Sequence, residues 1–144
     1  MTKIKWGTVA ILAMSVLFFF LPYMKHMGDS YNPIQILQDE YVAARGNITA
    51  EVILGYVIPV ALTFLSALIM ALKIGTGKCI ACIVLNVISA ALYWLFIMET
   101  YLPTNEIGFV GNVIITHLGI ILPIVCIVLL KKHKKRLCKL NMKE

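Results

Sequence analysis

Two cysteines three residues apart have the most specific spacing for chemistry in this 144-residue sequence. Cys79 and Cys82 form a Cys-Ile-Ala-Cys motif, and His133 and Cys138 follow far downstream. Such a pair can form a reversible disulfide, and three cysteines with one histidine can bind tetrahedral zinc. Lysines surround His133 and oppose a cation. We therefore expect no metal and no cofactor, and interpret Cys79 and Cys82 as small apolar residues of a helix.

Polar side chains inside apolar segments are the second group with chemical potential, because each costs free energy in lipid unless it is paired. Asn86 and His117 lie within such segments, Glu51 stands at the start of another, and Glu99 stands at the end of the segment that contains Asn86. A pair between His117 and a glutamate can carry protons or bind a cation, which predicts a small transporter or channel. The simpler interpretation is that Asn86 and His117 make hydrogen bonds between helices, worth about 0.6–2 kcal/mol each.

The elements that position these residues are apolar enough to lie in a membrane. Hydrophobic residues make up 60% of the chain and charged residues 14%, against about 45–50% and about 25% in soluble domains. This excludes a soluble enzyme and a disordered chain. Helices need roughly 20 residues to span a bilayer, and four apolar segments approach that length: residues 6–23, 51–72, 78–98 and 109–130.

Apolar residues fall on every side of each segment, as expected for helices surrounded by lipid and by each other. The predicted fold is therefore all-α: a polytopic membrane protein with a four-transmembrane-helix bundle, forming a single domain over residues 1–144. The lysine-rich and isoleucine-rich composition is compatible with a low-GC bacterium.

The basic residues predict the orientation, because Lys and Arg resist translocation. Eleven of the 13 lie at the N-terminus, in the turn between the second and third segments, and in the tail 131–144. The other two connections hold six of the seven acidic residues. We expect a multi-pass protein of the cell membrane with both termini cytoplasmic. The positive charge then attracts anionic lipid headgroups, and no nucleic acid is expected as a partner.

A Cys-x-x-Cys motif in a four-helix membrane protein resembles the quinone-linked thiol oxidoreductases, such as those of the vitamin K epoxide reductase kind. The redox pair of that group faces the oxidising side, with further cysteines in an outer loop. Here the predicted topology puts Cys79 and Cys82 at the cytoplasmic end, where thiols are kept reduced, and the outer loops contain no cysteine. The sequence departs from this group at the position that its chemistry requires.

The first outer connection contains start and stop signals for a short amphipathic helix, predicted over Pro33–Arg45. Asn32 is a good N-cap residue, Pro33 suits the first helical position, and Gly46 suits the end. Apolar residues recur at spacings of three and four along it. The candidate interaction residues on this face are Ile34, Leu37 and Tyr41.

Two of the apolar segments share a Gly-x-x-x-Pro pattern, at Gly55 to Pro59 and at Gly119 to Pro123. Each proline removes a backbone hydrogen bond and is expected to kink its helix. Each glycine allows a neighbouring helix to approach closely. We interpret both features as packing features.

Three functions are compatible with the sequence. The favoured one is a non-enzymatic accessory, regulatory or immunity-type interaction protein, whose partners are the lipid bilayer and another membrane protein or a second copy of the chain. The first alternative is a small-solute or ion transporter or channel that uses His117 and Asn86. The second is a membrane thiol oxidoreductase that uses Cys79 and Cys82. No catalytic residue is assigned, because the candidates are scattered over separate helices.

Overall fold

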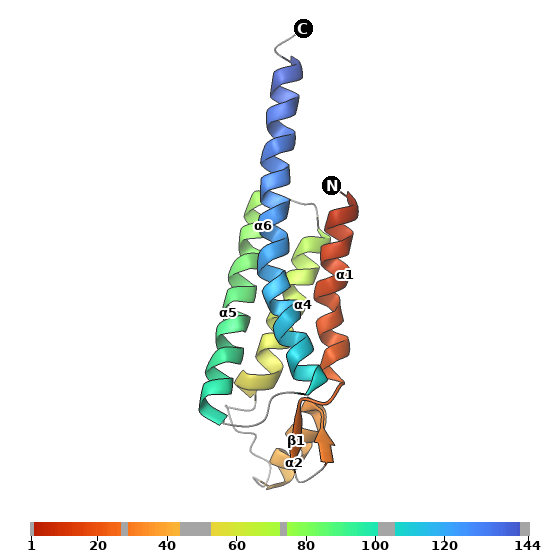
Figure 1. Ribbon diagram of the computed structural model, residues 1–144, viewed down its shortest axis with the longest axis vertical. Coiled ribbons are helices and arrows are strands. Elements are labelled where there is room, and N and C mark those ends of the chain that lie inside the picture. The colour runs from red at the N-terminus through yellow and green to blue at the C-terminus, as the bar shows by residue number, and fades with distance from the viewer. Residues whose placement is uncertain (1, 27–28, 44–52, 73–74, 101–105, 142–144) are drawn as a thin grey trace.

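The computed structural model describes residues 2–26, 29–43, 53–72, 75–100 and 106–141, and most of them are helical. Figure 1 shows the elements in chain order: α1 (Thr2–Phe19), β1 (Met24–His26), β2 (Asp29–Tyr31), α2 (Pro33–Ala43), the π-helix η1 (Ile53–Val57), α4 (Ile58–Ala71), α5 (Thr76–Thr100) and α6 (Ile107–Asn141).

The four long helices pack side by side and alternate in direction. Both α1 and α5 contact α4 on one side and α6 on the other. We call this packed group the bundle. Its hairpin end carries β1, β2 and α2, and its terminal end is where α1 and α5 begin (Figure 1). Beyond the terminal end, α6 continues alone for several turns.

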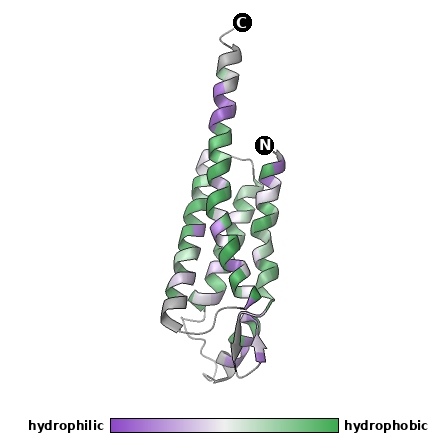
Figure 2. Cartoon of the chain, viewed as in Figure 1, coloured by the Kyte–Doolittle hydropathy of each residue, from purple (hydrophilic) through white to green (hydrophobic). Residues whose placement is uncertain are grey.

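Among the described residues, three helices are long and apolar enough to cross a membrane: Ile53–Ala71, Thr76–Leu95 and Ile107–Lys135. Their large apolar side chains point outward as well as inward; Leu68, Ile114 and Val128, for example, are more than half exposed. In Figure 2 the helices of the bundle are coloured mostly as hydrophobic residues, and α6 beyond the bundle is coloured as hydrophilic residues. A soluble protein does not expose apolar surface on this scale. The chain is therefore a mostly helical, membrane-embedded protein.

The ends of two helices differ from their predicted places. The first apolar segment was expected to continue to Tyr23, but α1 ends at Phe19. Pro22 has no backbone N–H, and the N–H of Tyr23 donates to the carbonyl of Tyr31 at 2.8 Å, so these residues belong to the hairpin region. At the other end of the chain, the basic tail continues α6 as far as Asn141.

A two-stranded antiparallel hairpin precedes α2, and the sequence analysis did not predict it. Met24 pairs with Tyr31 and His26 with Asp29. The Asn32 side chain accepts from the Gln35 N–H at 2.9 Å, and the Gln35 side chain accepts from the Asn32 N–H at 3.0 Å. This capping box satisfies two amide groups that otherwise lack an acceptor, and α2 begins at the next residue, Pro33.

The helix type changes just before Pro59, the first of the two prolines at which a kink was expected. The chain is a π-helix over Ile53–Val57 and an α-helix from Ile58 onward, so Pro59 lies in the first turn of α4. Proline is tolerated there because the amide groups of a first turn have no acceptor within the α-helix. Pro123, by contrast, lies inside α6.

Candidate functional site

The bundle buries polar side chains among its apolar core residues and exposes apolar side chains on its outside. Every buried polar side chain that the structure describes is neutral, and together they are Thr8, Ser15, Thr63, Ser66, Asn86, Ser89, Asn112 and Thr116. All eight are at most 1% exposed. Neutral groups of this kind are tolerated in a membrane when they bond to one another across helices. Their bonding pattern therefore defines what the interior can do.

Three hydroxyl groups meet where α4, α5 and α6 are closest to η1. The Thr63 hydroxyl lies 3.2 Å from that of Ser89 and 3.1 Å from that of Thr116. Thr63 and Ser89 both donate to the carbonyl oxygen of Pro59, at 3.0 Å and 2.8 Å. A hydroxyl can donate once and accept twice, so this group satisfies itself without water or charge.

Asn86 forms a second group, nearer the terminal end. Its Nδ2 donates to the Ser66 hydroxyl at 2.9 Å and to the Cys82 carbonyl at 2.8 Å. Its Oδ1 has no hydrogen-bond partner among the described residues. This oxygen faces Gly119, where an added Cβ would lie only 2.4 Å from it. A close approach of a neighbouring helix was expected at Gly119. In the structure the group that lies close to Gly119 is the polar side chain of Asn86. We call Thr63, Ser66, Asn86, Ser89 and Thr116 the polar layer.

His117 lies away from the polar layer. Its Nδ1 is 2.7 Å from the Val113 carbonyl, and the Trp94 indole donates to its Nε2 at 3.5 Å. Because an indole N–H can only donate, the ring that satisfies both contacts carries its proton on Nδ1. His117 and Gly119 are two residues apart, so they occupy nearly opposite sides of α6. The structure therefore does not bring His117 and Asn86 together.

Neither glutamate that was considered as a partner of His117 has a side chain that the structure describes. Glu51 lies outside the described residues, and Glu99 belongs to α5 but its side chain is not described. The described neighbours of His117 are uncharged.

Cys79 and Cys82 lie in a cluster that the sequence did not reveal. They pack with Met70 and Cys126, and all three thiols are free and buried. Cys138 is exposed, far along α6. Within the described ranges, no three His, Cys, Asp or Glu side chains are arranged to hold a metal ion. The missed residue, Cys126, is seven residues from Gly119, a spacing that returns to the same helix face.

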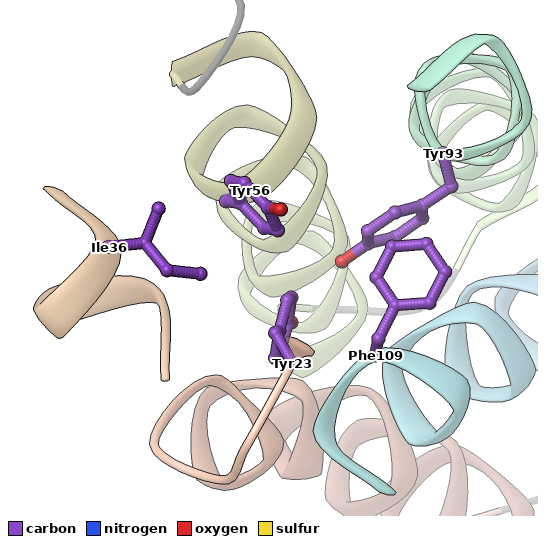
Figure 3. Close-up of a cluster of buried hydrophobic side chains, with 5 residues drawn as sticks. All are labelled: Tyr23, Ile36, Tyr56, Tyr93 and Phe109. Atoms are coloured by element: carbon purple, nitrogen blue, oxygen red, sulfur yellow. The ribbon is translucent and has the colours of Figure 1, made fainter. Parts of the chain in front are cut away.

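The hairpin end is closed by a cluster of side chains from five segments, which we call the aromatic cap: Tyr23, Ile36, Tyr56, Tyr93 and Phe109 (Figure 3). The Tyr93 and Phe109 rings lie 5.3 Å apart edge to face, and the Tyr23 and Phe109 rings 5.8 Å apart. The Tyr23 hydroxyl also accepts a hydrogen bond from Asn112. These contacts fix the start of the hairpin to α6.

The aromatic cap also decides which side of α2 is free. Ile36 is buried in it and Leu37 packs against it. Ile34 is 36% exposed, and Gln38 and Asp39 are exposed. Of the three interaction candidates, Leu37 therefore faces the bundle and Ile34 faces outward. The side chain of Tyr41 is not described.

Comparisons with protein-family models, with curated proteins and with solved structures found no match for this chain.

Proposed function

We propose that the protein crosses the cell membrane four times as an all-α, four-transmembrane-helix bundle, with both termini cytoplasmic. The fourth span is α1, which packs between α4 and α6 over the length of the bundle. Support comes from the helix arrangement, because α1 begins at the same end as the basic start of α5. The basic residues of the sequence favour the cytoplasmic side for this end.

Cysteine labelling tests this topology. In a cysteine-free background, Asp29→Cys should react with an impermeant maleimide added outside intact cells, because Asp29 is exposed at the hairpin end. Asn141→Cys should react only after the membrane is permeabilised. The opposite pattern would show that the proposed orientation is inverted, and labelling of both sites from outside would mean that the number of spans between residues 29 and 141 is even.

Within this topology, the protein acts as a non-enzymatic interaction protein that contacts another membrane protein or a second copy of itself. The observation that carries this proposal is the placement of α2. Ile36 anchors the helix on the aromatic cap, so that Ile34, Gln38 and Asp39 face away from the bundle. A helix held by one face and free on the other is a suitable docking element for a partner helix or loop. The buried polar side chains of the described interior, by contrast, are all neutral.

Site-specific crosslinking tests the interaction. A photo-crosslinking residue that replaces Gln38 should give a product of one defined mass in intact cells, and Ile34→Asp should abolish it without changing expression. The matched control replaces Lys132, an exposed residue beyond the opposite end of the bundle; this probe should not give the same product. If Gln38 and Lys132 give the same product, or if Gln38 gives none, α2 is not the docking element.

One observation favours a second function, a small-ion transporter. The buried Asn86 Oδ1 has no described hydrogen-bond partner, and an amide oxygen is a ligand for hard cations. Proteoliposomes loaded with a sodium-sensitive or a pH-sensitive dye should then show a flux that Asn86→Leu removes. His117→Ala should leave this flux intact, because His117 lies on another side of α6. A flux no greater than that of empty liposomes would reject the transporter.

A further inference from the structure

A surface pocket of about 280 Å³ lies where α6 leaves the bundle at the terminal end. It is lined by Gly75, Thr76, Leu130, Lys131, His133 and Lys134. Four of these residues form one face of α6, Thr76 is the first residue of α5, and Gly75 directly precedes it. Lys132 and Lys135 are exposed in the same segment of α6 but do not line the pocket.

The lining groups are hydrogen-bond donors of the kind that recognise phosphate. Lys131 and Lys134 bring two ammonium groups, and Thr76 and His133 add a hydroxyl and a ring nitrogen. No described acidic side chain lines the pocket. The first turn of α5 also lies here, and its amide groups have no acceptor within the helix. Together these groups favour a ligand with several negatively charged oxygens.

The position of the pocket identifies the source of that phosphate. Leu130 is the last residue of the apolar part of α6, and the lysines begin at the next position (Figure 2). Toward the hairpin end, α5 exposes Ile80, Val84 and Val87, whose spacing puts them on the same helix face as Thr76. The pocket thus lies at the boundary between apolar and basic surface, where the headgroup of a lipid meets its acyl chains. Its volume is at the lower end of small-molecule sites, so it accommodates a headgroup and leaves the chains outside.

We propose that this pocket binds the phosphate-bearing headgroup of an anionic phospholipid, whose acyl chains lie along the exposed apolar side of α5 that continues from Thr76. This inference rests on the proposed membrane embedding, with the basic end among lipid headgroups, but it requires no protein partner. Juxtamembrane lysines attract anionic lipids in general. Binding in the pocket differs from this general attraction because it places one lipid per protein chain at a defined position.

Two double variants separate the pocket from the general charge of the tail. Purified full-length protein in a nonionic detergent is titrated with short-chain phosphatidylglycerol, and native mass spectrometry counts the bound lipid. Lys131→Gln with Lys134→Gln should weaken binding about 25-fold, since each lysine near a lipid charge contributes on the order of fivefold. Lys132→Gln with Lys135→Gln removes the same charge from outside the pocket and should weaken binding at most about twofold. Equal losses in the two variants would overturn the proposal.

A change at Thr76 tests the site from the side of α5. Thr76→Glu puts a carboxylate into the pocket, while a negative charge at a helix start favours helix formation. This variant should therefore fold and lose phosphatidylglycerol binding, whereas Thr76→Gln should keep it within about twofold. If Thr76→Glu binds as the wild type does, the headgroup is not in this pocket.

Two further probes identify the ligand chemistry. Short-chain phosphatidylcholine should bind at least about tenfold more weakly than phosphatidylglycerol, because its net charge is zero. Inorganic phosphate should not displace the lipid at equal concentration, because it gains no apolar contact. Equal binding of the two lipids, or displacement by phosphate, would contradict an anionic-lipid site. Crosslinking at Gln38 probes the opposite end of the bundle, so its outcome is independent of these results.

Discussion

At the hairpin end of the bundle, side chains from five segments bury one another, whereas at the terminal end α6 leaves the bundle and exposes its lysines. Tyr23 and Tyr93 are fully buried in the aromatic cap. Lys131 and Lys134 are exposed beside an open pocket. We therefore expect substitutions in the aromatic cap to lower stability, and substitutions of the exposed lysines at the terminal end to affect the proposed binding of a lipid headgroup instead.

Glycine substitutions at the two ends should show the largest difference. A Cβ added at Gly108 would lie 2.6 Å from the carbonyl oxygens of both Leu21 and Pro22, and the Gly108 N–H donates to Pro22 at 2.8 Å. Backbone cannot move aside as a side chain can. Gly108→Ala should therefore lower the free energy of unfolding by about 2–3 kcal/mol, the cost of overpacking.

The control for this prediction is Gly77→Ala at the terminal end, where an added Cβ meets nothing within 4 Å. This change should alter stability by less than about 0.5 kcal/mol. Unfolding of both variants in mixed micelles, followed by circular dichroism, gives the comparison. Equal stabilities would show that the contact between the start of α6 and residues 21–22 is not formed in the protein.

Two isoleucines of α2 provide the next largest effect. Ile36 is 8% exposed in the aromatic cap, and Ile34 is 36% exposed. Ile36→Ala should cost about 2 kcal/mol through lost burial and an unfilled cavity, and Ile34→Ala less than about 0.5 kcal/mol. Hydrogen exchange should then be faster in α2 for Ile36→Ala alone. Faster exchange in both variants would mean that α2 is not anchored through Ile36.

The residues of α2 also show which features of the fold can be predicted from the sequence alone. Asn32 and Pro33 mark the start of the helix by local rules, and the structure begins α2 there. The long helices could be predicted from the apolar segments in the same way, because length and hydropathy are local properties. The β-hairpin left only a weak signal, Gly28 between two short strands, because strands of three residues are too short to show an alternating pattern.

The inner face of each helix was not predictable from the sequence. Where apolar residues surround a helix on every side, hydropathy does not define which side faces the bundle. Asn86 and His117 therefore looked equivalent, although one faces Gly119 and the other Trp94. The grouping of Cys126 with Cys79 depends on the register between α5 and α6, which no single segment encodes.

The polar layer lies between the two ends, and a double-mutant cycle tests how tightly it is packed. Gly119→Ala would place a Cβ 2.4 Å from Asn86 Oδ1 and 2.8 Å from Leu12 Cδ2. It should cost about 1–2 kcal/mol in the wild-type background. In the Asn86→Ala background the first clash is absent, so the cost should fall by at least about 0.5 kcal/mol. Additive effects of the two substitutions would mean that Asn86 does not face Gly119.

The smallest effect concerns a single charged contact at the terminal end. The Lys5 ammonium donates to the Ala71 carbonyl at 2.8 Å and thereby binds the negative end of the α4 dipole. Lys5→Met keeps the apolar part of the side chain and removes this bond, which should cost about 0.3–1 kcal/mol at low salt. Lys3→Met removes the same charge from an exposed position two residues away and serves as the control. Because salt screens exposed charges, the difference between the two variants should shrink between low salt and about 1 M salt. A difference that does not change with salt would show that Lys5 acts through packing. The terminal end would then depend on packing, as the hairpin end does.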